Sequence, residues 1–151
     1  GLSHWACCPG TGAAGGTAFA LAAVLGAELA IGIDHLARVV GLRERLESAD
    51  LLLTGEGSLD AQSLDGKAVS GVLRLACECS VPSMVFAGRV KMGAKAQQRL
   101  ADLRAQEIIQ ISDPSEPLGT SLQRGPYHLR RAVADVVRRF STGCPLKTRS
   151  G

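Results

Sequence analysis

The chain has 151 residues, 46% of them apolar and only 3% aromatic, so we expect one domain whose core is built from Ala, Val, Leu and Ile. The net charge of +3 is too modest to indicate a polyanionic partner. No apolar stretch reaches the ~20 residues of a membrane span, and no basic segment precedes an apolar one at the amino terminus. We therefore expect no membrane partner and a cytoplasmic location.

The first third of the chain contains predicted helices and no convincing strand. Residues 1–8 have no clear pattern and are followed by a glycine-rich turn at Pro9–Gly16. The turn is expected to open an Ala/Leu-rich helix over 17–29. Apolar residues at helical spacing then predict further helix over 32–41 and a short helix over 42–48.

The rest of the chain alternates predicted strands with predicted helices. The strands are the apolar runs 51–54, 83–87 and 107–111. The helices are 68–79, 95–104 and 127–140. The continuous apolar character of the three strand segments is typical of central parallel strands. Prolines and glycines between the third strand and the last helix predict a long irregular loop over 112–126.

This order predicts an α/β fold with a mostly parallel sheet and helices on both faces, a Rossmann-like layer. We divide the chain into an irregular segment over 1–8, an α/β domain over 9–141 and a mobile tail over 142–151. In such sheets ligands gather at the carboxyl ends of the strands. The loops predicted over 55–67 and 88–93 both leave from such ends, so we expect them to be neighbours in one cleft.

Neither the basic residues nor the cysteines indicate a site. The basic group is Arg130, Arg131, Arg138 and Arg139. It alternates with Ala and Val, as on the solvated face of a helix, and lacks the interleaved aromatics of a nucleic-acid surface. The cysteines are Cys7, Cys8, Cys77, Cys79 and Cys144. They make no metal-binding spacing with the three histidines, so we expect buried free thiols in a reducing cytosol.

The run from Thr54 to Lys67 concentrates polar groups directly after a predicted buried strand. Glu56 and Asp60 could hold Mg²⁺ or accept a proton from a substrate hydroxyl. Lys67, at the start of the next helix, could reach a phosphate or an acidic substrate. Alternatively, Asp60 and Gln62 cap turns and Lys67 is a surface charge. The run is not a Walker A loop, because its glycine spacing and the residue after Lys67 differ.

The earlier glycine cluster matches G-x-G-x-x-G through Gly10, Gly12 and Gly15. Backbone N–H groups at the start of the following helix could bind a phosphate or carboxylate. Tight packing of small residues is a second interpretation. A dinucleotide fingerprint is a third, although residues 3–8 make a poor preceding strand.

Residues 49–67, A-D-L-L-L-T-G-E-G-S-L-D-A-Q-S-L-D-G-K, resemble the signature of the bacterial glycerate kinase family, of the glycerate-2-kinase type. The turn at Pro9–Gly16 resembles that family's second glycine-rich element. Val81-Pro82, followed by a strand ending at Gly88, also fits. The resemblance runs from about Pro9 to Ile111.

The resemblance implies part of a two-lobed kinase that transfers the γ-phosphoryl group of ATP, with Mg²⁺, to a hydroxyl of glycerate in organic-acid metabolism. The motif positions are Gly55, Glu56, Gly57, Asp60, Gln62, Gly66 and Lys67. On chemical grounds we assign catalysis to Asp60, Glu56 and Lys67, with Mg²⁺ or the attacking hydroxyl on Asp60 or Glu56. The expected substrate- or nucleotide-binding residues are Gly10, Gly12, Gly15, Gly16, Thr54, Gly55, Gly57, Gln62 and Gly66.

The sequence also departs from that family. Its members are much longer, Asp65 adds a negative charge to the signature, and residues 1–8 do not resemble the family. The chain is therefore similar to the carboxyl-terminal part of a glycerate kinase and would supply one wall of a cleft. The alternatives are an inactive truncated remnant or, on the glycine cluster alone, a dinucleotide-binding oxidoreductase domain. No pattern indicates the oligomeric state.

Overall fold

Three parallel strands form the centre of the structure, a computed structural model that describes residues 2–60 and 68–143. The strands are β1 (Leu52–Asp60), β2 (Ser83–Lys91) and β3 (Ala105–Gln110), in the order β1-β2-β3. Leu53 of β1 lies opposite Met84 of β2, and Met84 lies opposite Glu107 of β3. All three carboxyl ends therefore point the same way, as the strand pattern of the sequence predicts.

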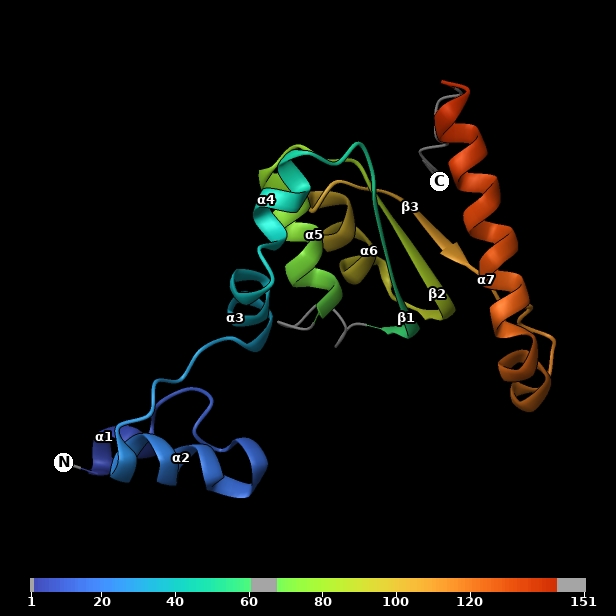
Figure 1. Ribbon diagram of the computed structural model, residues 1–151. Coiled ribbons are helices and arrows are strands. Elements are labelled where there is room, and N and C mark those ends of the chain that lie inside the picture. Colours follow the sequence, from blue (N-terminus) through green and yellow to red (C-terminus); the bar gives the residue numbers. More distant parts are fainter. Residues whose placement is uncertain (1, 61–67, 144–151) are drawn as a thin grey trace.

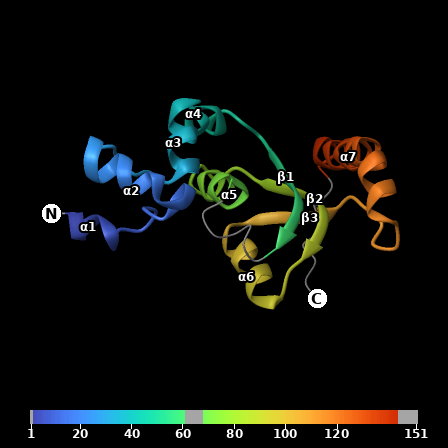
Figure 2. The ribbon, with the colours of Figure 1, turned by 90° about the horizontal axis from the view of Figure 1, so that it is seen from below.

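Helices cover both faces of this sheet. In the described part they are α1 (Leu2–Ala6), α2 (Ala13–Leu25), α3 (Gly32–Val39), α4 (Leu42–Glu47), α5 (Ala68–Glu78), α6 (Ala94–Asp102) and α7 (Leu118–Ser141). Figures 1 and 2 show α5 and α6 on one side of the strands and α7 on the other. The predicted α/β class with a parallel sheet is thus confirmed.

Apolar clusters fill the space on each face of the sheet. On the α5 and α6 face, Leu59, Leu73 and Leu100 are almost completely buried. On the opposite face, Val136 of α7 packs with Met84 and Phe86 of β2. Because β2 contributes side chains to both clusters, the central strand joins the two layers.

Helices α1 and α2 lie at one side, away from the sheet, in both views (Figures 1 and 2). Helix α2 makes its main helix-to-helix contact with α1. Its only buried side chain is Ala22, whereas Val24 and Leu25 are more than 70% exposed. An apolar helix that is exposed in this way is unusual, because such helices are normally buried.

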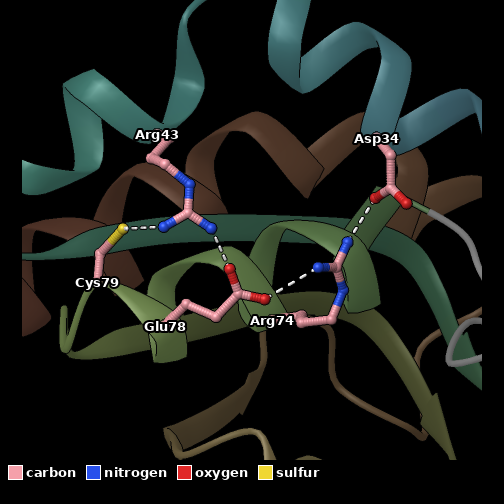
Figure 3. A network of polar contacts seen from close by, with 5 residues as sticks. All are labelled: Asp34, Arg43, Arg74, Glu78 and Cys79. Carbon is pink, nitrogen blue, oxygen red and sulfur yellow. Dashed lines mark hydrogen bonds and ion pairs between the residues drawn. The ribbon is translucent and has the colours of Figure 1, made fainter.

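A network of charged side chains ties α3 and α4 to α5 (Figure 3). The carboxylate of Glu78 accepts hydrogen bonds from Arg43 of α4 and from Arg74, with 3.0 Å between Arg74 Nη1 and Glu78 Oε1. Arg74 also donates to Asp34 of α3. The same helices also share an apolar cluster, in which Leu46 of α4 packs with Ala37 of α3 and Leu75 of α5.

Replacing Glu78 with Gln should lower stability at neutral pH but not in acid. The hydrogen bond from Arg43 lowers the pKa of Glu78, with a further lowering contribution from Arg74. A lowered pKa in the folded state stabilises the protein above the unfolded pKa of about 4.3 and loses that effect as the pH falls. The urea midpoints of wild type and Glu78→Gln should therefore differ at neutral pH and converge in acid.

The control for this prediction is Glu28→Gln, because Glu28 is exposed and has no ion pair among the described residues. Its midpoint should follow that of the wild type at every pH. Equal midpoints for Glu78→Gln and wild type at neutral pH and low salt would show that the network adds nothing measurable.

Several predicted boundaries are wrong. Strands β1 and β2 continue to Asp60 and Lys91, so the first part of the polar run is strand rather than loop. Helix α7 begins at Leu118 and includes Pro126, where a loop was expected. Pro126 removes one helical N–H group. The helix continues beyond it to Ser141, and its Val136 is fully buried against the sheet. The predicted irregular segment over 1–8 contains helix α1, and most of the predicted tail, 144–151, lies outside the described residues.

The expectation of buried thiols is also wrong for the cysteines that the structure describes. Cys7 is exposed, and Cys8, Cys77 and Cys79 are half-buried, all four as free thiols. Cys144 lies outside the described residues. No helix in the described ranges is long and apolar enough to cross a membrane.

Candidate functional site

The carboxyl halves of β1 and β2 approach each other closely because both carry glycine at the contact. A Cβ atom added at Gly55 would lie 2.5 Å from the carbonyl oxygen of Phe86. One added at Gly88 would lie 2.5 Å from the carbonyl oxygen of Gly57. Gly55 in the polar run and Gly88 in the neighbouring strand are therefore needed to form this end of the sheet.

β2 continues beyond the end of β3, and there side chains form hydrogen bonds with the backbone of β2. The N–H group of Val90 donates to Oε1 of Gln110 at 3.0 Å, and the hydroxyl of Ser112 donates to the carbonyl oxygen of Gly88. The Nε2 group of Gln110 donates in turn to the carbonyl oxygen of Ser112 at 3.1 Å. These bonds hold the segment from Gly88 to Lys91 in an extended conformation.

A cavity of about 940 Å³ lies between this end of the sheet and α7. The sheet and the two residues after β3 contribute Leu53, Thr54, Gly55, Glu56, Gly57, Ser58, Phe86, Gly88, Arg89, Lys91, Ile111 and Ser112. Helix α7 contributes Leu118, Ser121, Leu122, Gly125, Pro126, His128, Leu129 and Val133. The volume is near the upper end of the range of roughly 300–1,000 Å³ that is typical of small-molecule sites.

The structure brings together part of the predicted site. Thr54, Gly55, Glu56 and Gly57 line the cavity. Asp60, at the end of β1, lies opposite Lys91 in the parallel pairing and is not among the lining residues. The remaining predicted residues of the run, Gln62, Gly66 and Lys67, lie outside the described residues.

The four predicted binding glycines near the amino terminus do not reach this cavity. Gly10 and Gly12 lie between α1 and α2, and Gly15 and Gly16 lie near the start of α2, where the backbone is not helical. None of the four lines the cavity. Three of them have positive φ angles, which the tight turn requires. No strand precedes them within the described residues, so the context of a dinucleotide fingerprint is absent there.

Glu56 is the described carboxylate best placed for a cation. Its Oε2 atom is buried and has no hydrogen-bond partner. No group of three or more His, Cys, Asp or Glu side chains that could hold a metal occurs in the described ranges. One or two carboxylates suit Mg²⁺ that is shared with phosphates and water, rather than a metal held by protein ligands alone.

Sequence reasoning missed the cations and the apolar wall of the cavity. Arg89 and Lys91 were assigned to a loop, although their alternation along an extended segment could have placed them on one face of a strand. The spacing of Leu118, Leu122 and Leu129 is helical and continues to Val133 and Val136. That periodicity was the available signal for α7.

A family model described as "Glycerate kinase family" matches residues 2–141. The chain belongs to the glycerate kinase family. The match begins at residue 2, so the expectation that residues 1–8 fall outside the family is wrong, and it includes α7 as well.

Individual relatives agree with this assignment. The chain is 44% identical over 80 residues to "Glycerate 2-kinase" of Escherichia coli strain K12, covering 53% of this chain and 21% of that protein. It is 30% identical over 128 residues to "Glycerate kinase" of Bacillus subtilis strain 168, covering 85% and 33%.

A solved structure extends the likeness to the fold. The crystal structure of "putative glycerate kinase 2" from Salmonella typhimurium LT2 matches with a TM-score of 0.66 and 29% identity, over 89% of this chain and 33% of that one. The chain thus spans a third or less of the length of these three relatives.

Proposed function

We propose that the chain contributes to a glycerate kinase, which transfers the γ-phosphoryl group of ATP to a hydroxyl of glycerate. The observation that carries the proposal is the cavity at the carboxyl ends of β1 and β2, which is lined by Thr54–Gly57 of the family signature. Ligands of open α/β sheets bind at this edge. A cytoplasmic location remains a prediction.

Phosphoryl transfer depends mainly on positioning and on stabilising negative charge. Arg89 and Lys91 supply positive charge beside the signature residues. Glu56, with its unpartnered buried oxygen, or Asp60 would hold Mg²⁺, which would neutralise the phosphates. Asp60 would alternatively accept the proton of the attacking hydroxyl.

The test is phosphoryl transfer by this chain with ATP, Mg²⁺ and glycerate, followed as release of ADP. We expect ADP release that requires glycerate, and we expect Asp60→Ala to lower kcat by about 100-fold or more in a chain that still folds. The matched control is Asp102→Ala in α6, because Asp102 is exposed and lies outside the cavity.

Unchanged turnover in Asp60→Ala would refute the role of that residue. Absence of any ADP release that depends on glycerate, in a folded chain, would instead favour the inactive remnant. A thermal shift on adding ATP and Mg²⁺ but no turnover would describe a remnant that still binds ligand.

A further inference from the structure

The cavity beneath α7 has two chemically different ends. At the sheet, the cations Arg89 and Lys91 stand beside the family signature, where Glu56 is the lining carboxylate. Along α7, the wall is aliphatic and includes Leu118, Leu122 and Leu129. A ligand that fills both ends must combine an anionic group with a body that gains from apolar contact.

Glycerate does not meet this description, because a three-carbon hydroxy acid has no apolar body to bury. A nucleotide does, since its phosphates are anionic and its base is flat and largely apolar on both faces. Leu118 and Leu122 are 56% and 69% exposed, so the helix presents aliphatic surface that a base can cover. The volume of about 940 Å³ admits a ligand of that size.

We propose that the cavity beneath α7 is the nucleotide site, with the base against the leucines of α7 and the phosphates at Arg89 and Lys91. This inference rests on the proposed kinase function and adds to it where the phosphoryl donor binds. His128 also lines the cavity, and its Nε2 atom is buried without a hydrogen-bond partner. The polar edge of a base could supply that partner.

Binding of ADP and of adenosine to the full chain, measured by titration calorimetry, tests the two ends separately. Leu122→Glu and Leu129→Glu place a charge in the apolar wall and should weaken both ligands by about tenfold or more. The matched control is Val137→Glu, because Val137 is 45% exposed on the same helix but does not line the cavity. It should leave both affinities unchanged.

The phosphate end is tested with Arg89→Ala. Loss of a charge-assisted hydrogen bond should weaken ADP by about tenfold and leave adenosine almost unaffected. The control is Arg130→Ala, since Arg130 is an exposed arginine of α7 outside the cavity. Melting curves of each variant establish that the chain remains folded.

Failure to bind ADP or adenosine at millimolar concentration overturns the proposal. Affinities that are unchanged in Leu122→Glu and Leu129→Glu also overturn it. Failure to bind would indicate that a protein segment, and not a nucleotide, covers the leucines of α7. Nucleotide binding with the predicted pattern but no phosphorylation of glycerate would leave this site intact and refute the kinase function. If the chain phosphorylates glycerate but its affinity for nucleotide does not change in these variants, the kinase function stands and this nucleotide site is refuted.

Discussion

Gly88→Ala should destabilise the sheet by about 1–3 kcal/mol, the usual cost of forcing extra atoms into a packed site. The new methyl group would meet the carbonyl oxygen of Gly57 at 2.5 Å. That oxygen belongs to the backbone of β1, so it cannot move aside as a flexible side chain would. Relief requires β1 and β2 to separate at their carboxyl ends, where the cavity lies.

The matched control is Gly57→Ala on the neighbouring strand. A Cβ atom there would meet nothing within 4 Å, and the φ angle of Gly57 is not in the left-handed region. Alanine should therefore be neutral or stabilise the strand by about 0.5–1 kcal/mol. Urea unfolding followed by circular dichroism compares the two variants, and equal midpoints would contradict the close approach of the strands.

Val136→Asp should remove α7 from the sheet and cost about 3 kcal/mol or more, because it leaves a carboxylate buried without a partner. Val136 is fully buried against Met84 and Phe86. The adjacent Val137 is 45% exposed, so Val137→Asp should change stability by no more than about 0.5 kcal/mol.

Urea midpoints and near-ultraviolet circular dichroism of both variants test this prediction. A Val136→Asp protein as stable as the wild type would mean that α7 does not depend on this contact. The cavity beneath α7 would then lack its stated wall, so this result also bears on the nucleotide site.

The layer order of the fold could be predicted from sequence because apolar runs and helical stripes mark each element. The ends of the elements could not, because they depend on contacts between distant residues. β1 continues to Asp60 only because Gly55 and Gly88 let it approach β2 so closely. A single-sequence interpretation treats those glycines as signs of a loop.

The same limit applies to the candidate site. The signature was recognisable from its residue types, and six of its residues, all in β1, line the cavity. The α7 wall was missed because Pro126 was given more weight than the apolar spacing around it. The amino-terminal glycines were expected to bind substrate or nucleotide, which requires them to lie at the cavity. A local sequence pattern does not determine where a turn lies in space.

The exposure of α2 has a consequence for cooperativity. With Ala22 as its only buried side chain, α2 shares little apolar contact with the sheet layer. Its amide hydrogens would then exchange through local openings that leave the strands paired. One free energy of unfolding would therefore describe the layer of β1, β2 and β3 but not the whole chain.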